Sequence, residues 1–166
     1  MADIPSTPAD GNYKVVWVPT LADPDAPTST EVTGASVVDL SCYLTADGWT
    51  PGLSEQVIAD ERLCSTETFE QMGRAARTLS VRYIVNPTDT TNNKAAETLV
   101  PGTAGYLITR SGKAFDTALA AADKAWVWPV TPGQYSELPP EANSVLKQEQ
   151  KMFVRARVRP NVAVAA

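Results

Sequence analysis

The chain has 166 residues, of which 43% are apolar, and it carries a net charge of −5 and no histidine. This length predicts one domain spanning residues 1–166, with enough apolar side chains for a hydrophobic core. The acidic balance argues against a general nucleic-acid binder. The absence of histidine excludes Ser-His-Asp and Cys-His nucleophiles and removes the commonest metal ligand.

Targeting signals are also missing from the sequence. No apolar run approaches the roughly 20 residues that a transmembrane helix needs, so we expect no contact with a membrane. The first residues, MADIPSTPADG, have neither the basic nor the apolar region of a signal peptide. Without such a signal, we expect Cys42 and Cys64 to be reduced thiols rather than a disulfide.

The first part of the chain predicts an extended arm and two strands. Residues 1–11 are polar and contain prolines, which is typical of an extended arm. Residues 13–18, YKVVWV, are rich in β-branched and aromatic side chains and predict a strand. A proline-rich loop over residues 20–31 follows, and then residues 36–44, SVVDLSCYL, predict a second strand.

Residues 45–74 form a long excursion with little apolar content, which we expect to be a long loop or hairpin. Asp47-Gly48 and Pro51-Gly52 are turn signals near its start. Long loops in compact domains usually have a function, so this segment is a candidate contact region.

Two structures remain open for residues 56–72 within this excursion. The composition of QVIADERLCSTETFEQM is compatible with a helix or with two short strands over residues 57–63 and 68–72. We favour the two strands, because the apolar residues are sparse for an amphipathic helix.

Residues 78–85, TLSVRYIV, predict the clearest short strand, with Leu79, Val81 and Tyr83 on one face. The stretch after Asn86-Pro87 predicts one short helix over about residues 91–99, capped by Thr91 or Asn92 and ended by Pro101-Gly102. We expect it to be the only helix of the chain.

Two more strands are predicted over residues 106–109 and 124–130. In the second one, KAWVWPV, two tryptophans share one face and smaller apolar residues share the other. Both faces are therefore expected to be buried. Pro132-Gly133 predicts a turn after it.

The C-terminal part, residues 145–158, predicts one long strand that Pro160 ends, leaving residues 160–166 as a tail. From Met152 onward it alternates with period two, which places an apolar and a basic series on opposite faces. The apolar series is Met152, Val154, Ala156 and Val158, and the other is Lys151, Phe153, Arg155, Arg157 and Arg159.

The total is six or seven strands and one short helix. Strands separated by turns, rather than by regular helices, predict an antiparallel sandwich or barrel. A long strand near the end of the chain needs partners along both of its edges.

No catalytic, cofactor or metal site is expected. The carboxylates of Asp60, Glu61, Glu67 and Glu70 are close in sequence, but without a pocket signature they are more typical of a solvated surface. Metal-ligand spacings of Cys or His are absent. The Gly-Lys step at residues 112–113 lacks the glycine spacing and the Ser or Thr of a phosphate loop.

Tryptophan and arginine are the remaining candidates for contacts. We expect three of the four tryptophans in the core and Trp49, in a turn region, at an interface. The basic series with Arg155 and Arg157 is compatible with phosphate contacts, a solvated face, or pairing with acids of a neighbouring strand or chain.

The order of segments resembles one known family. VVDLSCYLTADGWTPG is followed by VIADERLCSTETFEQMG, RTLSVRYIVNP, KAAETL, PGTAGYLITR, DKAWVWPVTPG and PPEANSVL. This series, over nearly the whole chain, resembles the major tail tube proteins of long-tailed (siphovirus-type) bacteriophages, especially those of actinobacterial hosts. No catalytic motif carries the resemblance.

The resemblance implies a fold and a function. The fold is mainly β, an antiparallel sandwich or half-barrel with one short flanking helix, a long loop and extended termini. The function is structural: hexameric rings stack into a tail tube, the conduit for genome ejection. The partners are further copies of the chain, the tape measure protein and the tail terminator. Double-stranded DNA passes through an electronegative lumen without specific binding.

The resemblance places the protein in the virion tail, assembled in the cytoplasm of the bacterial host. It also implies that the arm and the long loop make the contacts between rings. The candidate contact residues are Trp49, Asp60, Glu61, Arg62, Glu67, Glu70, Arg155 and Arg157.

Two other functions remain open. A tail terminator or head–tail joining protein also forms a ring but stops at one ring. A carbohydrate-binding β-sandwich module would use Trp49 or Trp126 as a stacking platform.

Overall fold

The computed structural model describes residues 3–89 and 91–166. It consists of one curled antiparallel sheet of the half-barrel type with two short helices, which confirms the predicted fold class. The sheet runs in the order β2-β1-β5-β6-β7-β4-β3, and β8 pairs with the first part of β6. The elements are β1 (Tyr13–Val18), α1 (Ser29–Thr33), β2 (Val38–Asp39), β3 (Leu44–Asp60), β4 (Phe69–Ile84), α2 (Lys94–Thr98), β5 (Gly105–Ser111), β6 (Lys124–Glu137), β7 (Lys147–Val154) and β8 (Arg159–Ala163).

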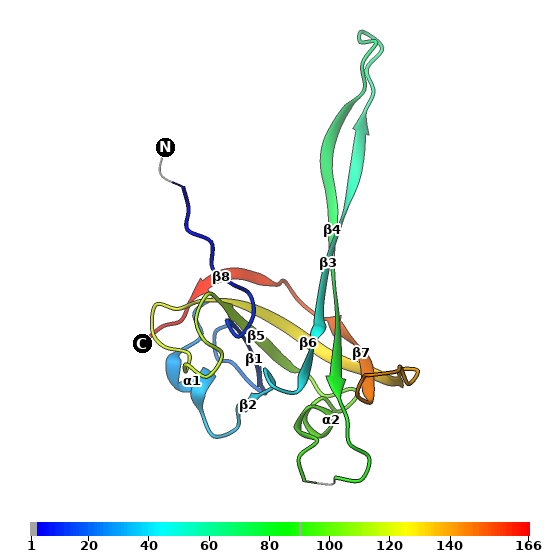
Figure 1. Cartoon of the computed structure of the whole chain (residues 1–166). Coiled ribbons are helices and arrows are strands. Elements are labelled where there is room, and N and C mark those ends of the chain that lie inside the picture. Colours follow the sequence, from blue (N-terminus) through cyan, green and yellow to red (C-terminus); the bar gives the residue numbers. More distant parts are fainter. Residues whose placement is uncertain (1–2, 90) are drawn as a thin grey trace.

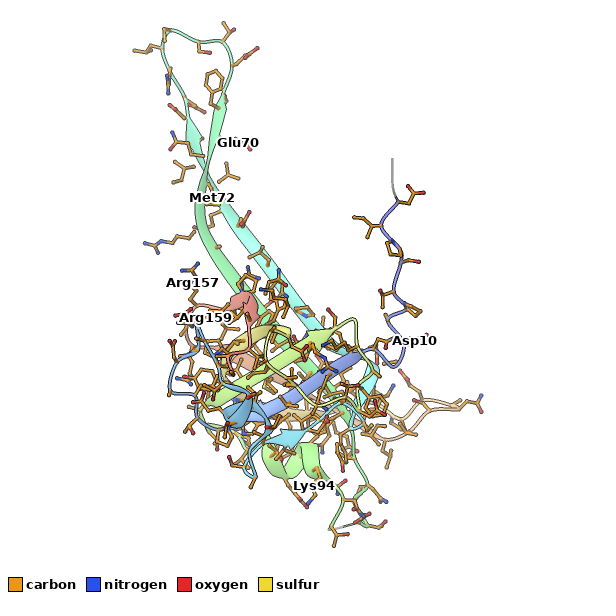
Figure 2. All side chains as sticks on the ribbon, turned by 90° about the vertical axis from the view of Figure 1, so that its left-hand side faces the viewer. Asp10, Glu70, Met72, Lys94, Arg157 and Arg159 are labelled. Atoms are coloured by element: carbon orange, nitrogen blue, oxygen red, sulfur yellow. The ribbon has the colours of Figure 1, made fainter. Side chains whose placement is uncertain are left out.

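Two features project from the body of the protein. The hairpin of β3 and β4 leaves the sheet as a long twisted ribbon (Figure 1). The N-terminal arm, before β1, projects from the same side of the body, apart from the hairpin (Figures 1 and 2).

The strands β1, β5 and β6 are buried on both faces. Val15 and Trp17 point into the main core inside the curl, while Val16 and Val18 point into a second core behind the sheet. The second core is closed by Val32 of α1 and by the C-terminal segment. The expected two-sided burial of residues 124–130 is confirmed, because Trp128 belongs to the first core and Val127 to the second.

Residues 45–74 form most of the long hairpin, so the alternative of a helix over residues 56–72 is wrong. The two turns expected near its start are also wrong, because Asp47-Gly48 and Pro51-Gly52 lie inside β3. The register shifts between Leu44 and Trp49, and a Cβ on Gly48 would clash with the carbonyl oxygen of Arg82. This glycine therefore marks an irregularity in a continuous strand, not its end.

The prediction of one strand over residues 36–44 is wrong except for residues 38–39, which form β2. Only Val38–Asp39 pair with β1. The carboxylate of Asp39 then accepts hydrogen bonds from the backbone N–H and the hydroxyl of Ser41, at 2.9 and 2.6 Å. This local Asx contact starts a turn and ends the strand.

The C-terminal segment is two strands instead of one. β7 and β8 both run along β6, but residues 155–158 bulge away between them. Pro160 lies inside β8 instead of ending the strand. Met152 and Val158 are buried as expected, whereas Ala156 is exposed, because the alternation is lost in the bulge.

The helix expected near residues 91–99 is confirmed as α2, but its N-cap is Asn93 and not Thr91 or Asn92. The expectation of a single helix is wrong, since α1 begins inside the loop expected over residues 20–31. Thr28 and Glu31 form a capping box at its start, in which each side chain accepts a hydrogen bond from the other residue's backbone N–H.

The strands over residues 78–85 and 106–109 are confirmed as parts of β4 and β5. Leu79, Val81 and Tyr83 are buried together, as the alternation predicts. The turn at Pro132-Gly133 is wrong, because β6 continues to Glu137 with a register shift after Pro132.

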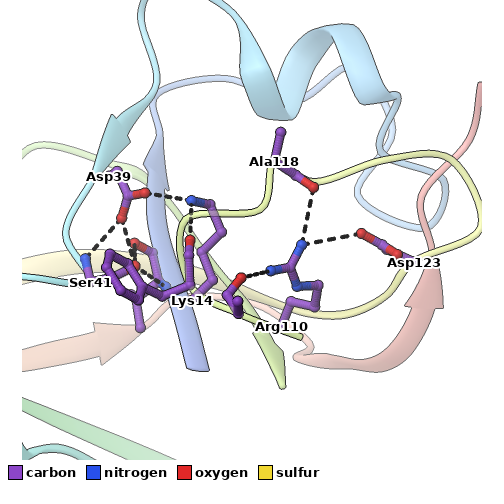
Figure 3. A network of polar contacts seen from close by, with 9 residues as sticks. Lys14, Asp39, Ser41, Arg110, Ala118 and Asp123 are labelled. Atoms are coloured by element: carbon purple, nitrogen blue, oxygen red, sulfur yellow. Dashed lines mark hydrogen bonds and ion pairs between the residues drawn. The ribbon is translucent and has the colours of Figure 1, made fainter. Parts of the chain in front are cut away.

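A buried polar network fixes the loop between β5 and β6 (Figure 3). Arg110 donates to the carbonyl oxygens of Ala114 and Ala118, at 2.7 and 3.0 Å, and pairs with Asp123 at 3.3 Å. Lys14 pairs with Asp39 at 2.5 Å. The buried groups of Lys14, Arg110 and Asp123 serve the fold, since each has a charged partner in the chain.

Candidate assembly surface

The outer hairpin, defined here as residues 53–74, exposes almost all of its side chains. A two-stranded ribbon in water is only marginally stable by itself, and exposed apolar groups on it indicate a contact surface. Met72, for example, is 79% exposed. The exposed large apolar residues of this segment are Leu53, Val57, Ile58, Leu63, Phe69 and Met72.

The strand register distributes these side chains over both faces of the ribbon. Val57 lies opposite Met72, and Asp60 lies opposite Phe69. Directly opposed residues share a face, and neighbours along a strand alternate. Both faces therefore combine apolar with charged groups: Val57 and Met72 share one face with Glu70, and Phe69 shares the other with Asp60.

The charges of the outer hairpin are mostly acidic. The guanidinium of Arg62 donates two hydrogen bonds, of 2.7 and 3.2 Å, to the carboxylate of Asp60. These bonds lower the pKa of the Asp60 carboxyl. Glu61, Glu67 and Glu70 form no ion pair with any residue that the structure describes. The outer hairpin thus presents three carboxylates that no described residue neutralises.

Five of the eight candidate contact residues come together on this hairpin: Asp60, Glu61, Arg62, Glu67 and Glu70. The other three lie elsewhere on the body. Figure 2 shows Glu70 far out on the hairpin and Arg157 close to the body. Their contacts with other subunits stay a prediction.

Arg155 and Arg157 lie in the bulge between β7 and β8, which we call the basic bend (residues 155–158). Arg155 is engaged within the chain: it donates to the carbonyl oxygen of Gly105 at 3.4 Å and lies 4.9 Å from the centre of the Tyr106 ring. Arg159, next to the bend, pairs with Asp25 at 2.5 Å. Arg157 is exposed and has no carboxylate at ion-pair distance within residues 3–89 and 91–166.

Trp49 lies at the root of the hairpin, half-buried against Trp128, with ring centres 5.9 Å apart at 87°. Trp126 stacks on Trp128 at 6.2 Å, and Arg77 lies 5.6 Å from the centre of the Trp126 ring. These residues belong to a depression of about 340 Å³ between the hairpin root and the sheet. This aromatic groove is lined by Tyr13, Trp49, Pro51, Gly52, Leu53, Arg77, Thr109, Ser111, Trp126 and Trp128.

The aromatic groove as a whole was not predicted: three of the four tryptophans were expected in the core, and Trp126 was considered as a stacking platform only for a carbohydrate-binding module. Trp128 is buried, but Trp126 is half-buried and faces the groove. The alternation in KAWVWPV does place both rings on one face. Only the pairing of distant strands shows that Tyr13 and Arg77 join them.

The described residues contain no group of three or more His, Cys, Asp or Glu side chains placed to hold a metal ion. Within the same residues, every helix is too short or too polar to cross a bilayer. Cys42 and Cys64 are exposed, one at the start of the hairpin and one at its tip.

Two solved structures share the fold of this chain. One is a chain of the sixfold-symmetrised baseplate of the anti-feeding prophage, with a TM-score of 0.55 and 11% identity over 93% of this chain and 97% of that chain. The other belongs to the cap that terminates the tube of the same prophage, with a TM-score of 0.51 and 15% identity over 96% and 95%. No curated protein matches the sequence.

The sequence itself matches a family model described as phage tail tube protein, and the match covers residues 1–166. This agrees with the half-barrel fold that the chain shares with the two solved structures. The chain therefore belongs to the phage tail tube protein family and is a structural component of a phage tail.

Proposed function

We propose that this protein builds the tail tube of a long-tailed bacteriophage of an actinobacterial host, as stacked hexameric rings that conduct the genome during ejection. The observation that carries the proposal is the outer hairpin. It extends away from its own body and exposes apolar side chains together with unpaired carboxylates. Such a surface is explained by a neighbouring subunit that covers it.

The similarity to a sixfold-symmetrised assembly supports the ring symmetry. A ring closes only through a heterologous contact, in which one surface meets a different surface of the next copy. The outer hairpin and the basic bend are two such surfaces, and their charges have opposite signs. We propose that Glu61, Glu67 and Glu70 of one copy approach Arg157 of another.

The apolar side chains supply most of the stabilisation in this contact. Exposed ion pairs contribute about 0–1 kcal/mol each, whereas buried apolar area contributes about 25 cal/mol per Å². The charges therefore determine which surface is bound and in which register, and they contribute little to the affinity.

The role is structural rather than enzymatic. The net charge of −5 supports an electronegative lumen, along which double-stranded DNA slides without specific binding. The tube would be assembled in the host cytoplasm on the tape measure protein and closed by a tail terminator.

A charge-swap experiment tests the proposed contact. The variant Glu61→Lys/Glu67→Lys/Glu70→Lys and the variant Arg157→Glu should each assemble poorly, as measured by light scattering and sedimentation. Combining them should restore assembly, because opposite charges face each other again. Glu137→Lys is the matched control, since Glu137 is exposed at the other end of the sheet and without an ion pair in the described chain. Normal assembly of both charge-reversed variants would refute this contact.

A single-ring protein is the second candidate function. The similarity to the cap that terminates a tube favours it, because such a protein would share the fold but stop growing. Electron microscopy of the purified protein distinguishes the two functions, since one gives tubes and the other gives isolated rings.

A further inference from the structure

We propose that the aromatic groove of one copy binds the proline-bearing N-terminal arm of a second copy. This inference rests on the proposed self-assembly and names the segment and the site for one of its contacts. The arm is defined here as residues 3–10, DIPSTPAD.

Within the part of the chain that the structure describes, the arm forms hydrogen bonds to Asn12 alone. All of its residues are exposed, and the side chain of Ile4 is 94% exposed. The side-chain amide of Asn12 donates to the carbonyl oxygens of Pro8 and Asp10, and its backbone N–H donates to the carbonyl oxygen of Ala9. This clamp fixes the direction in which the arm leaves the body, and Figure 1 shows it extending into solvent.

The sequence of the arm favours one backbone conformation. Pro5 and Pro8 are separated by two residues, and a polyproline II helix has three residues per turn. Both rings therefore lie on one edge of the arm. Proline limits the backbone freedom that must be lost on binding, so such segments dock with a small entropic cost.

The groove has the features that bind such a segment. Polyproline II ligands dock on grooves lined by aromatic side chains, and four aromatic rings line this one. The ring of Trp128 lies 5.9 Å from that of Trp49 and 6.2 Å from that of Trp126, measured between ring centres. Tyr13 continues the row at 6.4 Å from Trp49. Tyr13 is exposed there and Trp49 and Trp126 are half-buried, so a pyrrolidine ring and an aliphatic side chain can pack against their rings.

The groove and the arm carry charges of opposite sign. Arg77 lies at the groove and forms no ion pair with the described residues. The arm carries Asp3 and Asp10, one at each end. Either carboxylate approaches Arg77 when the prolines occupy the aromatic row, and the direction of the arm decides which one.

The length of the arm suits a contact between copies. Residues 3–8, which precede the turn at residues 9–11, span about 19 Å in polyproline II, at about 3.1 Å per residue. The clamp at Asn12 directs the arm off its own body, so a second copy is the occupant within reach. The contact joins two different surfaces, and it therefore propagates from copy to copy as a ring or tube requires.

Tryptophan fluorescence offers a direct test. A synthetic peptide of residues 1–11, MADIPSTPADG, contains no Trp or Tyr, so emission from the protein reports its binding. Added to full-length subunits at a concentration below assembly, it should shift the tryptophan emission in a saturable way. The same peptide with Pro5→Ala and Pro8→Ala should give no saturable change.

Arg77→Gln should weaken peptide binding about threefold to tenfold, while Arg74→Gln should leave it unchanged. Arg74 is the matched control because it lies on the same strand, exposed and outside the groove. The absence of a saturable shift, or equal effects of the two substitutions, would overturn the inference.

A variant lacking residues 1–8 separates the possible occupants. Unchanged affinity for the peptide supports a second copy as the source of the arm. Tighter binding would show that the chain's own arm competes for the groove, and would overturn the assignment to a second copy. Tube formation is scored separately: tubes without any peptide binding would remove this inference and leave the proposed function intact.

Discussion

The side-chain amide of Gln150 donates a hydrogen bond of 2.6 Å to the carbonyl oxygen of Gly133, in the interior of the protein. The same amide donates to the carbonyl oxygen of Leu99 at 2.9 Å, and its oxygen accepts from the Tyr83 hydroxyl at 3.3 Å. Gln150 is completely buried. One side chain thus supplies hydrogen-bond donors to a carbonyl oxygen in the bulge of β6 and to another at the end of α2. Both irregular backbone segments can therefore stay buried.

We expect Gln150→Leu to destabilise the protein by about 1–3 kcal/mol, because it leaves the carbonyl oxygens of Gly133 and Leu99 buried without donors. Urea unfolding followed by circular dichroism measures the change. Gln134→Leu, at an exposed position of the same sheet, should change the free energy of unfolding by less than about 0.5 kcal/mol. Equal effects of the two substitutions would contradict the role assigned to Gln150.

The buried pair of Arg110 and Asp123 predicts a pH dependence of stability. Lys113, with Arg110 and the backbone N–H of Ala120, lowers the pKa of the Asp123 carboxyl below its usual range. A carboxyl whose pKa is lower in the folded state stabilises the protein above its unfolded pKa, and this stabilisation is lost as the pH falls below about 4.

Asp123→Asn should therefore be less stable than the native protein at pH 7, by about 3 kcal/mol or more, because it leaves Arg110 buried without its charge partner. The difference in melting temperature between the two proteins should shrink as the pH is lowered towards 3. Asp116→Asn, at an exposed site of the same loop, should match the native protein throughout. A difference that stays constant with pH would contradict this account.

The outer hairpin predicts a change in proteolysis on assembly. Its tip is exposed and makes few contacts with the body, so trypsin should cleave free subunits after Arg62. We propose that a neighbour covers this segment in the assembled protein, so cleavage should be slowed there. Arg62→Gln confirms the site by removing that fragment. Equal cleavage rates in subunit and assembly would show that the hairpin stays uncovered.

Much of the fold could be predicted from the periodicity of single strands. In β4, the alternation of Leu79, Val81 and Tyr83 gave the correct buried face, and in β6 the pattern around Trp128 gave burial on both sides. Such patterns are readable in a sequence because side chains alternate between the two faces of a strand, so apolar residues mark the buried face.

The lengths of the strands could not be predicted, because glycine and proline occur both in turns that end a strand and at irregularities inside a continuous strand. Gly48 and Gly133 both follow residues that favour turns, yet each allows a close approach of another strand inside a continuous one. A sequence alone does not show whether the backbone of Arg82, or the ring of Phe153, will pass over a glycine. Turn chemistry and bulge chemistry use the same residues.

The candidate contact surface was predicted in part. The acidic residues around Asp60 were placed together because they are close in sequence and lie on one hairpin. Arg155 was expected to contact phosphates, to lie on a solvated face or to pair with acids, but its guanidinium lies over the ring of Tyr106 in its own chain. The aromatic groove depends on Tyr13, Arg77 and Trp126, which come from three strands far apart in the sequence.

Cryo-electron microscopy of the purified full-length protein, across a concentration series, tests the central claim most directly. The account predicts tubes of stacked rings with six copies each, in which the outer hairpin contacts a neighbouring copy. Only monomers at every concentration, or tubes in which the outer hairpin stays in solvent, would contradict it.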